Sequence, residues 1–341
     1  AAALILGLCM AGMFPARLLA VDENFIALDN GTGIRAVIAP EHGGELASLS
    51  VRVDGRWYEL LYRAMDYNDR PGWRGKAPLL WPAAGVSIHP DAGVHCYVLN
   101  GELYGMPFHG FARKLPWRVL EERSADQPVA LVLGISETAE TRQFYPFAFE
   151  LKVEYQLHED RLRIEYTVIA DAGNTGAMPF SMGNHITFTA PVMPGSEPGQ
   201  LSFHTQLPEM LLRDSNKTFS GQVVPSPFMG WHDVGALERR NAVSLGGRQG
   251  PAELLVLDPS GLQLRLVHRA SSEPSEPAIR FNLWADTRDG FFSPEPWIGT
   301  QNSLNSGAGL VRLPPGETWT WEIDIIPSWA TPGDMKDEDS T

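Results

Sequence analysis

The chain has 341 residues, of which 43% are hydrophobic and 20% charged, a composition typical of a soluble globular protein with one large domain or two modest ones. It has 27 lysines and arginines against 41 aspartates and glutamates. The resulting net charge of −14 disfavours nucleic acids and anionic membrane surfaces as partners. Two cysteines are too few for a disulfide-rich scaffold or a cysteine-based zinc site. With 33 glycines and 27 prolines, turns should be frequent and long helices few.

Residues 1–14 form an uncharged apolar run that is shorter than the roughly 20 residues needed to span a bilayer. This length fits the hydrophobic region of an export signal, so we expect residues 1–20 to be a signal peptide remnant. A buried N-terminal helix is the alternative. A real signal would place the protein in the periplasm or outside the cell, and otherwise we expect it in the cytoplasm. Removal of the segment would leave Cys96 as the only thiol and allow no internal disulfide.

From residue 25 onward the dominant hydrophobic period is two, which is typical of half-buried strands. Residues 149–157 and 162–168 alternate in this way around a polar turn, which predicts an antiparallel hairpin. Residues 254–257 and 262–267 repeat the design around Asp258-Pro259-Ser260-Gly261. Residues 318–325 alternate again near the end of the chain.

This pattern predicts an all-β fold, a large antiparallel β-sandwich with few short helices. No low-complexity linker or fixed-period repeat divides the chain. We therefore expect one domain over residues 21–330, followed by a disordered acidic tail over residues 331–341.

Three clusters carry residues that could perform chemistry. His109 and Arg113 lie four apart around a glycine, as either a structural ion pair or a binding site. His185 follows a strand-like apolar run, where a histidine is more often a satisfied core residue than a functional one. Glu295 lies between two prolines, with aromatic residues on both sides. Such surroundings raise the pKa of a carboxylate, as a general base requires, although an exposed loop glutamate fits the local sequence equally well.

Six segments in order resemble the aldose 1-epimerase (galactose mutarotase-like) superfamily over roughly residues 25–327. They are Pro40-Glu41-His42-Gly43-Gly44-Glu45-Leu46, Pro78-Leu79-Leu80-Trp81-Pro82, His109-Gly110-Phe111-Ala112-Arg113 with Trp117, Gly183-Asn184-His185, Glu295-Pro296-Trp297 and Leu313-Pro314-Pro315-Gly316-Glu317-Thr318. Each motif is weak by itself, but six in order are fairly specific. Members of this superfamily are large β-sandwiches with a sugar cleft on one sheet, in agreement with the period-two pattern.

The resemblance implies an isomerase that interconverts the α and β anomers of a free aldose by opening and reclosing the ring. One group must remove the proton of the C1 hydroxyl while another protonates the ring oxygen, and neither step needs a metal or cofactor. Glu295 matches the family base and His185 the family acid. A histidine near its ordinary pKa can give and regain a proton close to neutral pH. We accordingly expect a small sugar as the partner, no metal and no cofactor. The sequence leaves the oligomeric state undetermined.

The resemblance carries the substrate-binding residues over less directly. Arg113 matches an arginine that contacts sugar hydroxyls or a phosphate, and Arg74 a second arginine of the hexose-6-phosphate epimerase branch. That branch has glutamine where this chain has Phe108. The family's sugar-holding aspartate has no clear match, and Asn241 is the nearest candidate. We also expect His109, Asn184 and Trp297 to bind substrate.

Two other functions fit the same motifs. One is a hexose-6-phosphate 1-epimerase. The other is a non-catalytic carbohydrate-binding or sensing domain, because a fold does not fix a function. The presence of both Glu295 and His185 argues against pure binding, which has no need of a paired acid and base. A polysaccharide lyase or hydrolase is disfavoured because no second carboxylate accompanies Glu295.

Overall fold

The structure is a computed structural model that describes residues 17–22, 24–68, 75–124, 128–238, 242–271 and 278–330. The expected acidic tail and residues 1–16 of the expected signal segment lie outside these ranges. Strand β1 (Arg17–Asp22) begins within residues 1–20 and pairs antiparallel with β2 (Phe25–Asp29).

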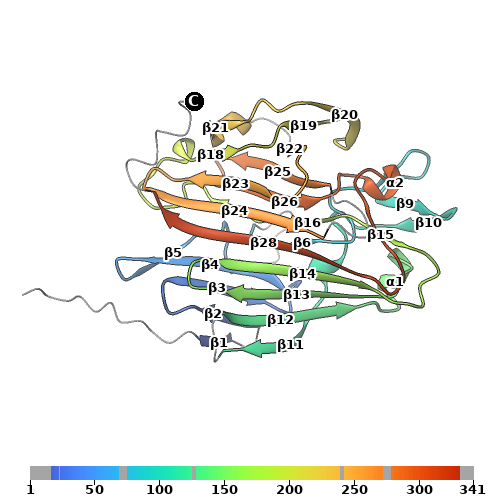
Figure 1. Ribbon diagram of the computed structural model, residues 1–341, viewed down its shortest axis with the longest axis horizontal. Coiled ribbons are helices and arrows are strands. Elements are labelled where there is room, and N and C mark those ends of the chain that lie inside the picture. The colour runs from blue at the N-terminus through green and yellow to red at the C-terminus, as the bar shows by residue number, and fades with distance from the viewer. Residues whose placement is uncertain are drawn as a thin grey trace, which may run out of the picture.

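Within the described ranges, the longest sheet has nine antiparallel strands and forms one layer of the molecule (Figure 1). The hairpin expected around residue 160 is confirmed, with Phe149 opposite Ala170 and Leu157 opposite Leu162. The second expected hairpin pairs Leu257 with Gln263. From edge to edge the strands are β11 (Arg118–Arg123), β12 (Val129–Ser136), β13 (Phe149–Leu157), β14 (Leu162–Ala170), β28 (Thr318–Trp329), β24 (Leu262–Ala270), β23 (Ala252–Leu257), β18 (Ser202–Thr205) and β21 (Gly230–Asp233).

Two further sheets form the second layer, which lies behind the first in Figure 1. Isolated bridges join them at Leu46–Ala77 and Leu61–Phe188. The smaller sheet contains β1, β2, β3 (Ile34–Ala39), β4 (Glu45–Val53) and β5 (Arg56–Glu59). The larger contains β20 (Phe219–Pro225), β19 (Glu209–Arg213), β22 (Val243–Gly246), β25 (Ile279–Asp286), β26 (Phe291–Ile298), β16 (Met182–Asn184) and β6 (Leu79–Leu80), with β17 (Phe188–Thr189) also paired to β26.

The remaining elements described are short. Three two-stranded ribbons pair β7 (Ile88–His89) with β8 (Gly93–Val94), β9 (Cys96–Leu99) with β10 (Glu102–Gly105), and β15 (Met178–Phe180) with β27 (Val311–Leu313). The helical turns are α1 (Thr141–Phe144), α2 (Ser303–Ser306), η1 (Ala112–Lys114), η2 (Pro198–Gln200) and η3 (Val234–Leu237). No helix among the described residues is long and apolar enough to cross a membrane. The fold is the expected all-β sandwich with few short helices.

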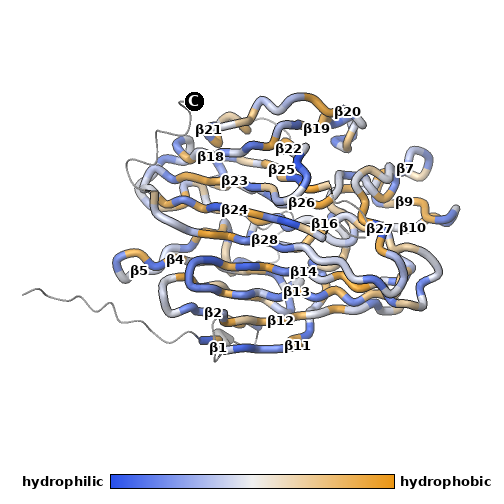
Figure 2. The backbone as a smooth tube through the Cα atoms, viewed as in Figure 1, coloured by the Kyte–Doolittle hydropathy of each residue, from blue (hydrophilic) through white to orange (hydrophobic). Residues whose placement is uncertain are grey.

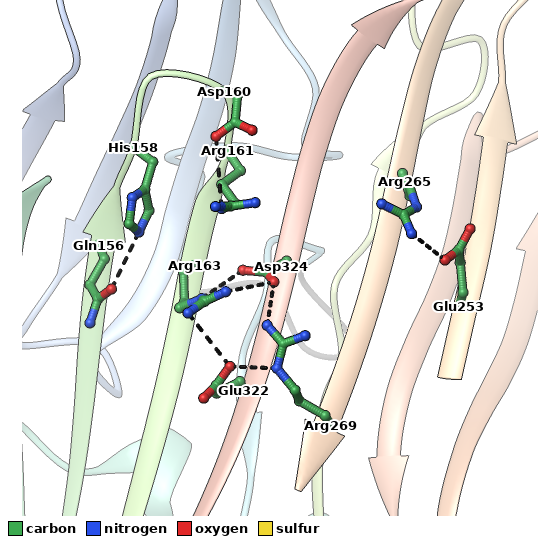
Figure 3. Close-up of polar contacts among 10 residues, drawn as sticks. All are labelled: Gln156, His158, Asp160, Arg161, Arg163, Glu253, Arg265, Arg269, Glu322 and Asp324. Atoms are coloured by element: carbon green, nitrogen blue, oxygen red, sulfur yellow. Dashed lines mark hydrogen bonds and ion pairs between the residues drawn. The ribbon is translucent and has the colours of Figure 1, made fainter. Parts of the chain in front are cut away.

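The core fills the space between the layers because alternate residues of each strand point inward. On β14 and β28, buried apolar side chains alternate with polar ones, and Figure 2 shows the alternating colours along these strands. The outward positions carry an ion-pair network (Figure 3). Arg163 on β14 and Arg269 on β24 both donate to Asp324 on the strand between them, at 2.8–3.0 Å. These charges lie on the face opposite the core, and none of these residues lines the cavity described next.

Candidate active site

A cavity of about 660 Å³ lies on the face of the larger second-layer sheet that points away from the core. Strands β19, β25 and β26 and the loops around them, including the one that follows β16, contribute its walls. Its lining residues are Gly85, Val86, Phe108, His109, Arg113, His185, Arg213, Asn216, Lys217, Ala242, Asn282, Trp284, Glu295, Trp297 and Gln301. The three clusters noted in the sequence therefore meet in one cavity.

Glu295 lies in the middle of β26, so the reading as an exposed loop residue is wrong. Only the two ends of β26 pair on the side away from β25, where Trp297–Ile298 pair with β16 and Phe291–Phe292 with β17. Pro294 and Pro296 fall in the unpaired stretch between, where a missing N–H removes no ladder bond on that side. The prolines thus mark a gap in the ladder on this side of β26, and Glu295, which lines the cavity, lies within that gap.

Two N–H donors hold the Glu295 carboxyl. Asn282 stands directly opposite on β25 and donates from Nδ2 to Oε1 at 3.4 Å. Trp297 donates from Nε1 to Oε2 at 3.0 Å. Burial raises the pKa of Glu295 to about 8, while the Trp297 bond, the charge of Arg213 and the Asn282 bond act in the opposite direction.

His185 follows β16 at the point where the chain leaves β26. Its backbone N–H donates to Pro78 O, and the Thr187 N–H donates to Lys76 O, each at 3.0 Å. His185 is buried, as a core histidine would be, yet it lines the cavity, and its Nε2 lies 3.7 Å from Glu295 Oε1. Burial lowers the pKa of His185 to about 4.

Hydroxyl groups behind His185 determine which ring nitrogen carries the proton. The Thr187 hydroxyl donates to His185 O at 3.0 Å and also contacts the Ser293 hydroxyl. Because the Thr187 proton is already used, Ser293 donates to Thr187 and leaves its oxygen to accept from His185 Nδ1, at 3.5 Å. Neutral His185 then presents the unprotonated Nε2 to Glu295, which suits proton exchange at that nitrogen.

The loop before η1 presents His109 to the cavity, and η1 itself presents Arg113. His109 adopts a φ of +65°, and its Nδ1 accepts the Gly85 N–H at 3.0 Å. A backbone N–H can only donate, so neutral His109 carries its proton on Nε2. Burial, followed by the charges of His185 and Arg113, lowers the pKa of His109 well below its ordinary value. Arg113 donates from Nη2 to Phe108 O at 3.2 Å, which fixes one arm of its guanidinium group.

The expected substrate-binding residues divide into three groups. His109, Arg113 and Trp297 line the cavity. Asn184 does not line it, and the structure corrects this expectation. The next residue, His185, lines the cavity, whereas the Asn184 amide points into the core and donates to Tyr166 Oη at 3.0 Å and Ala77 O at 3.2 Å. Arg74 and Asn241 lie outside the described residues.

Sequence reasoning missed Arg213, Asn282 and Gln301, which also line the cavity. Asn282 had a detectable signal, because it is a polar residue inside an apolar strand-like run. Arg213 is a charged residue at a strand end, which is the commonest place for one, so no local pattern distinguishes it. Within the described ranges, no group of three or more histidine, cysteine, aspartate and glutamate side chains is arranged to hold a metal ion.

The aldose 1-epimerase family profile matches residues 24–214. The plasmid form of Protein LacX from Lactococcus lactis subsp. lactis is 28% identical over 295 residues, which cover 80% of this chain and 87% of that protein. A galactose mutarotase-like protein from Clostridium acetobutylicum has a similar structure, with a TM-score of 0.74 at 19% identity, covering 92% of this chain and 98% of that one. The galactose 1-epimerase structure from Lactobacillus acidophilus NCFM gives a TM-score of 0.69 at 14% identity, covering 93% and 99%. The structural similarities establish the fold, and the profile match places this chain in the aldose 1-epimerase family.

Proposed function

We propose that this protein is an aldose 1-epimerase, an isomerase that interconverts the α and β anomers of a small sugar. The observation that carries the proposal is the buried pair Glu295 and His185 in one cavity, with Oε1 and Nε2 at 3.7 Å. Anomer exchange needs one group that takes the C1 hydroxyl proton and another that protonates the ring oxygen. These two oxygens are both bonded to C1, so they can meet two neighbouring groups on one cavity wall.

In this mechanism Glu295 acts as the base and His185 as the acid. Burial favours the neutral form of each group, so at neutral pH the pair holds one proton, on Glu295. The polar hydroxyls of a bound sugar replace lost hydration and favour transfer of that proton to His185. Glu295 then removes the C1 hydroxyl proton while His185 protonates the ring oxygen, and the reverse steps close the ring on either face. The pair ends the cycle with the same single proton.

In this proposal His109, Arg113 and Trp297 bind the substrate. Protonated at Nε2, neutral His109 offers a donor whose orientation is fixed by the Gly85 bond. The guanidinium group of Arg113 suits vicinal hydroxyls. Trp297 supplies an apolar ring face beside the carboxyl that it orients. A volume of about 660 Å³ lies within the range of about 300–1,000 Å³ that is usual for small-molecule sites.

The direct test is polarimetry on freshly dissolved α-galactose and α-glucose with the purified full chain. Acceleration of the approach to anomeric equilibrium, abolished by Glu295→Gln, supports the proposal. Saturable sugar binding without any acceleration, measured by calorimetry on the same sample, would instead identify a non-catalytic carbohydrate-binding or sensing domain.

A hexose 6-phosphate is the second candidate substrate, and the charge of the cavity favours it. Arg113, Arg213 and Lys217 line the cavity with Glu295 as the only acidic lining residue among those described, in a chain whose net charge is −14. We retain the neutral aldose as the first choice because an export signal at residues 1–20 would bring the enzyme to free sugars. Parallel assays with glucose and glucose 6-phosphate separate the two, and a preference above tenfold for the phosphate would overturn the first choice.

A further inference from the structure

A row of side chains crosses the larger second-layer sheet and ends at Glu295. In this row Leu211 on β19 is opposite Ser244 on β22, Ser244 is opposite Asn282 on β25, and Asn282 is opposite Glu295 on β26. Arg213 lies two residues after Leu211, beyond an irregularity in the β19–β20 register. The side chain of Ser244, between Leu211 and Asn282 in this row, is buried.

In the contact between Arg213 and Asn282, only Arg213 can be the hydrogen-bond donor. Arg213 Nη2 donates to Asn282 Oδ1 at 2.7 Å, and Gln301 Nε2 lies 3.5 Å from the same oxygen. A guanidinium group has donors only, so the amide oxygen of Asn282 must face Arg213. The amide nitrogen is then directed to Glu295 Oε1, at 3.4 Å. If the amide turned over, its oxygen would face the carboxylate and its NH2 group the guanidinium, and both contacts would be lost.

We propose that Arg213 is a positioning residue for the Glu295 carboxyl and acts through the Asn282 amide. Asn282 donates to Oε1 and Trp297 donates to Oε2, so each carboxyl oxygen of Glu295 has one oriented N–H donor. Oriented donors stabilise the ionised carboxyl, which has acceptors only. The positive charge of Arg213 acts in the same direction, against the burial that favours the protonated form. Arg213 thereby favours, within the single-proton pair, the form in which Glu295 is ionised and His185 carries the proton, and this role rests on the proposed function of Glu295.

Arg213→Met tests the inference, because methionine retains much of the apolar side chain but removes the charge and every donor. We expect the alkaline limit of the kcat/KM profile, where Glu295 loses its proton, to move up by about one pH unit. We expect kcat at pH 7 to fall about tenfold, because a higher pKa of Glu295 leaves a smaller fraction of the single-proton pair with its proton on His185. Arg213→Lys retains the charge and should restore part of the loss. Asn282→Ala should reproduce the direction of the shift, and the double variant should be no worse than the poorer single one.

Arg265→Met is the matched control, because Arg265 pairs with Glu253 at 2.6 Å on the other sheet and is exposed. Its pH profile should equal that of the wild type. A rise in KM with an unchanged pH profile for Arg213→Met would overturn the inference and assign Arg213 to substrate binding. A lower melting temperature with unchanged kinetics would overturn it in favour of a structural role.

A second measurement separates this inference from the proposed function. The infrared band of a protonated carboxylic acid, taken as the difference between each protein and its Glu295→Gln form, reports the titration of Glu295 without any substrate. The midpoint should be higher in Arg213→Met than in the wild type. If the wild type accelerates no anomer exchange but the midpoint still shifts, the proposed function fails and the positioning role stands. An unchanged midpoint would contradict the positioning role whatever the activity.

Discussion

His185 Nε2 lies 3.7 Å from Glu295 Oε1, although the two residues are distant in sequence, one directly after β16 and the other on β26. Neither side chain is more than 7% exposed. At this separation and burial the two groups titrate as a coupled pair. If both groups are protonated, no base is present, and if both are deprotonated, no acid is present. The single-proton state is therefore the form that can open a sugar ring.

Glu295→Gln removes the base while retaining the shape of the side chain. We expect the rate of mutarotation, followed by polarimetry, to fall about 10²-fold or more with little change in sugar affinity. His185→Gln should be comparably damaging, and the double variant should be little worse than either single one, because the pair acts as a unit. A Glu295→Gln enzyme within threefold of the wild-type rate would refute the assignment of the base.

Glu295→Gln lowers activity, but it should increase the stability of the fold at high pH. The folded pKa of Glu295 is raised to about 8 from 4.5, so the contribution of this group to stability is fully present below pH 4.5 and is lost as the pH rises through 8. Glutamine has no such dependence. We expect the melting temperature of Glu295→Gln, relative to the wild type, to increase between pH 5 and pH 9. A constant difference over that range would indicate that Glu295 titrates normally.

The kcat/KM profile should be bell-shaped and should report the titration of the pair. Below a pH of about 4 both groups are protonated, and above about 8 both are deprotonated, so activity should fall at each end. His109 should add no further step to the profile between these two pH values, because its pKa is well below the ordinary value. A midpoint near pH 6.5 on the acidic side would instead indicate a histidine in contact with water.

Arg113→Ala tests substrate binding. We expect kcat/KM to fall about tenfold or more, which corresponds to about 1.4 kcal/mol. The bond from Arg113 to Phe108 O is the competing structural role, and it predicts a lower melting temperature with unchanged kinetics. Arg142→Ala is a suitable control, since Arg142 is half exposed and pairs with Glu137 at a distance of 3.2 Å.

The sheets and the reacting pair could be predicted from the sequence to different extents. The hairpin of β13 and β14 follows from local alternation, which depends on burial of one face only. Glu295 could be identified through the resemblance, but its place in a strand could not, because Pro294 and Pro296 indicate a loop. Whether a proline fits inside a sheet depends on what pairs beside it, and strands distant in sequence decide that.

The role of Arg213 could not be predicted from the local sequence. Its contact with Asn282 depends on the order β19, β22, β25 and β26 in the sheet. That order is not encoded near residue 213. The expectation that Asn184 binds substrate is wrong for a simpler reason. Side chains alternate between the two faces of a sheet, so Asn184 points to the face opposite that of its neighbour His185. An error of one residue in the predicted register reverses such an assignment.

Asp324 on the outer face of the nine-stranded sheet should stabilise the fold without affecting activity (Figure 3). Burial alone would raise its pKa, but hydrogen bonds from Arg163 and the charges of Arg163, Arg269 and Arg161 lower it overall. A depressed pKa gives stability that is present above about pH 4 and is lost as the pH falls through the folded value. Asp324→Asn should cost about 2 kcal/mol in urea unfolding at pH 7, and less at pH 3. A cost that is equal at both pH values would contradict this account.

Gly110 allows the loop that carries His109 to approach Trp81. Its φ is +70°, and a Cβ atom at this position would lie 2.0 Å from Trp81 O, which also accepts the N–H groups of Phe111 and Ala112. Gly110→Ala should therefore lower stability by about 3 kcal/mol or more, because rigid backbone must move. Mutarotation should fall as well, since His109 moves with the loop. Gly101→Ala is the matched control: its φ is +86°, but among the described residues other than its two chain neighbours no atom lies within 4 Å of the added carbon. That variant should cost only about 1 kcal/mol, for the left-handed conformation alone, and should retain full activity. If the two variants unfold at the same urea concentration, the close approach to Trp81 does not restrict this position.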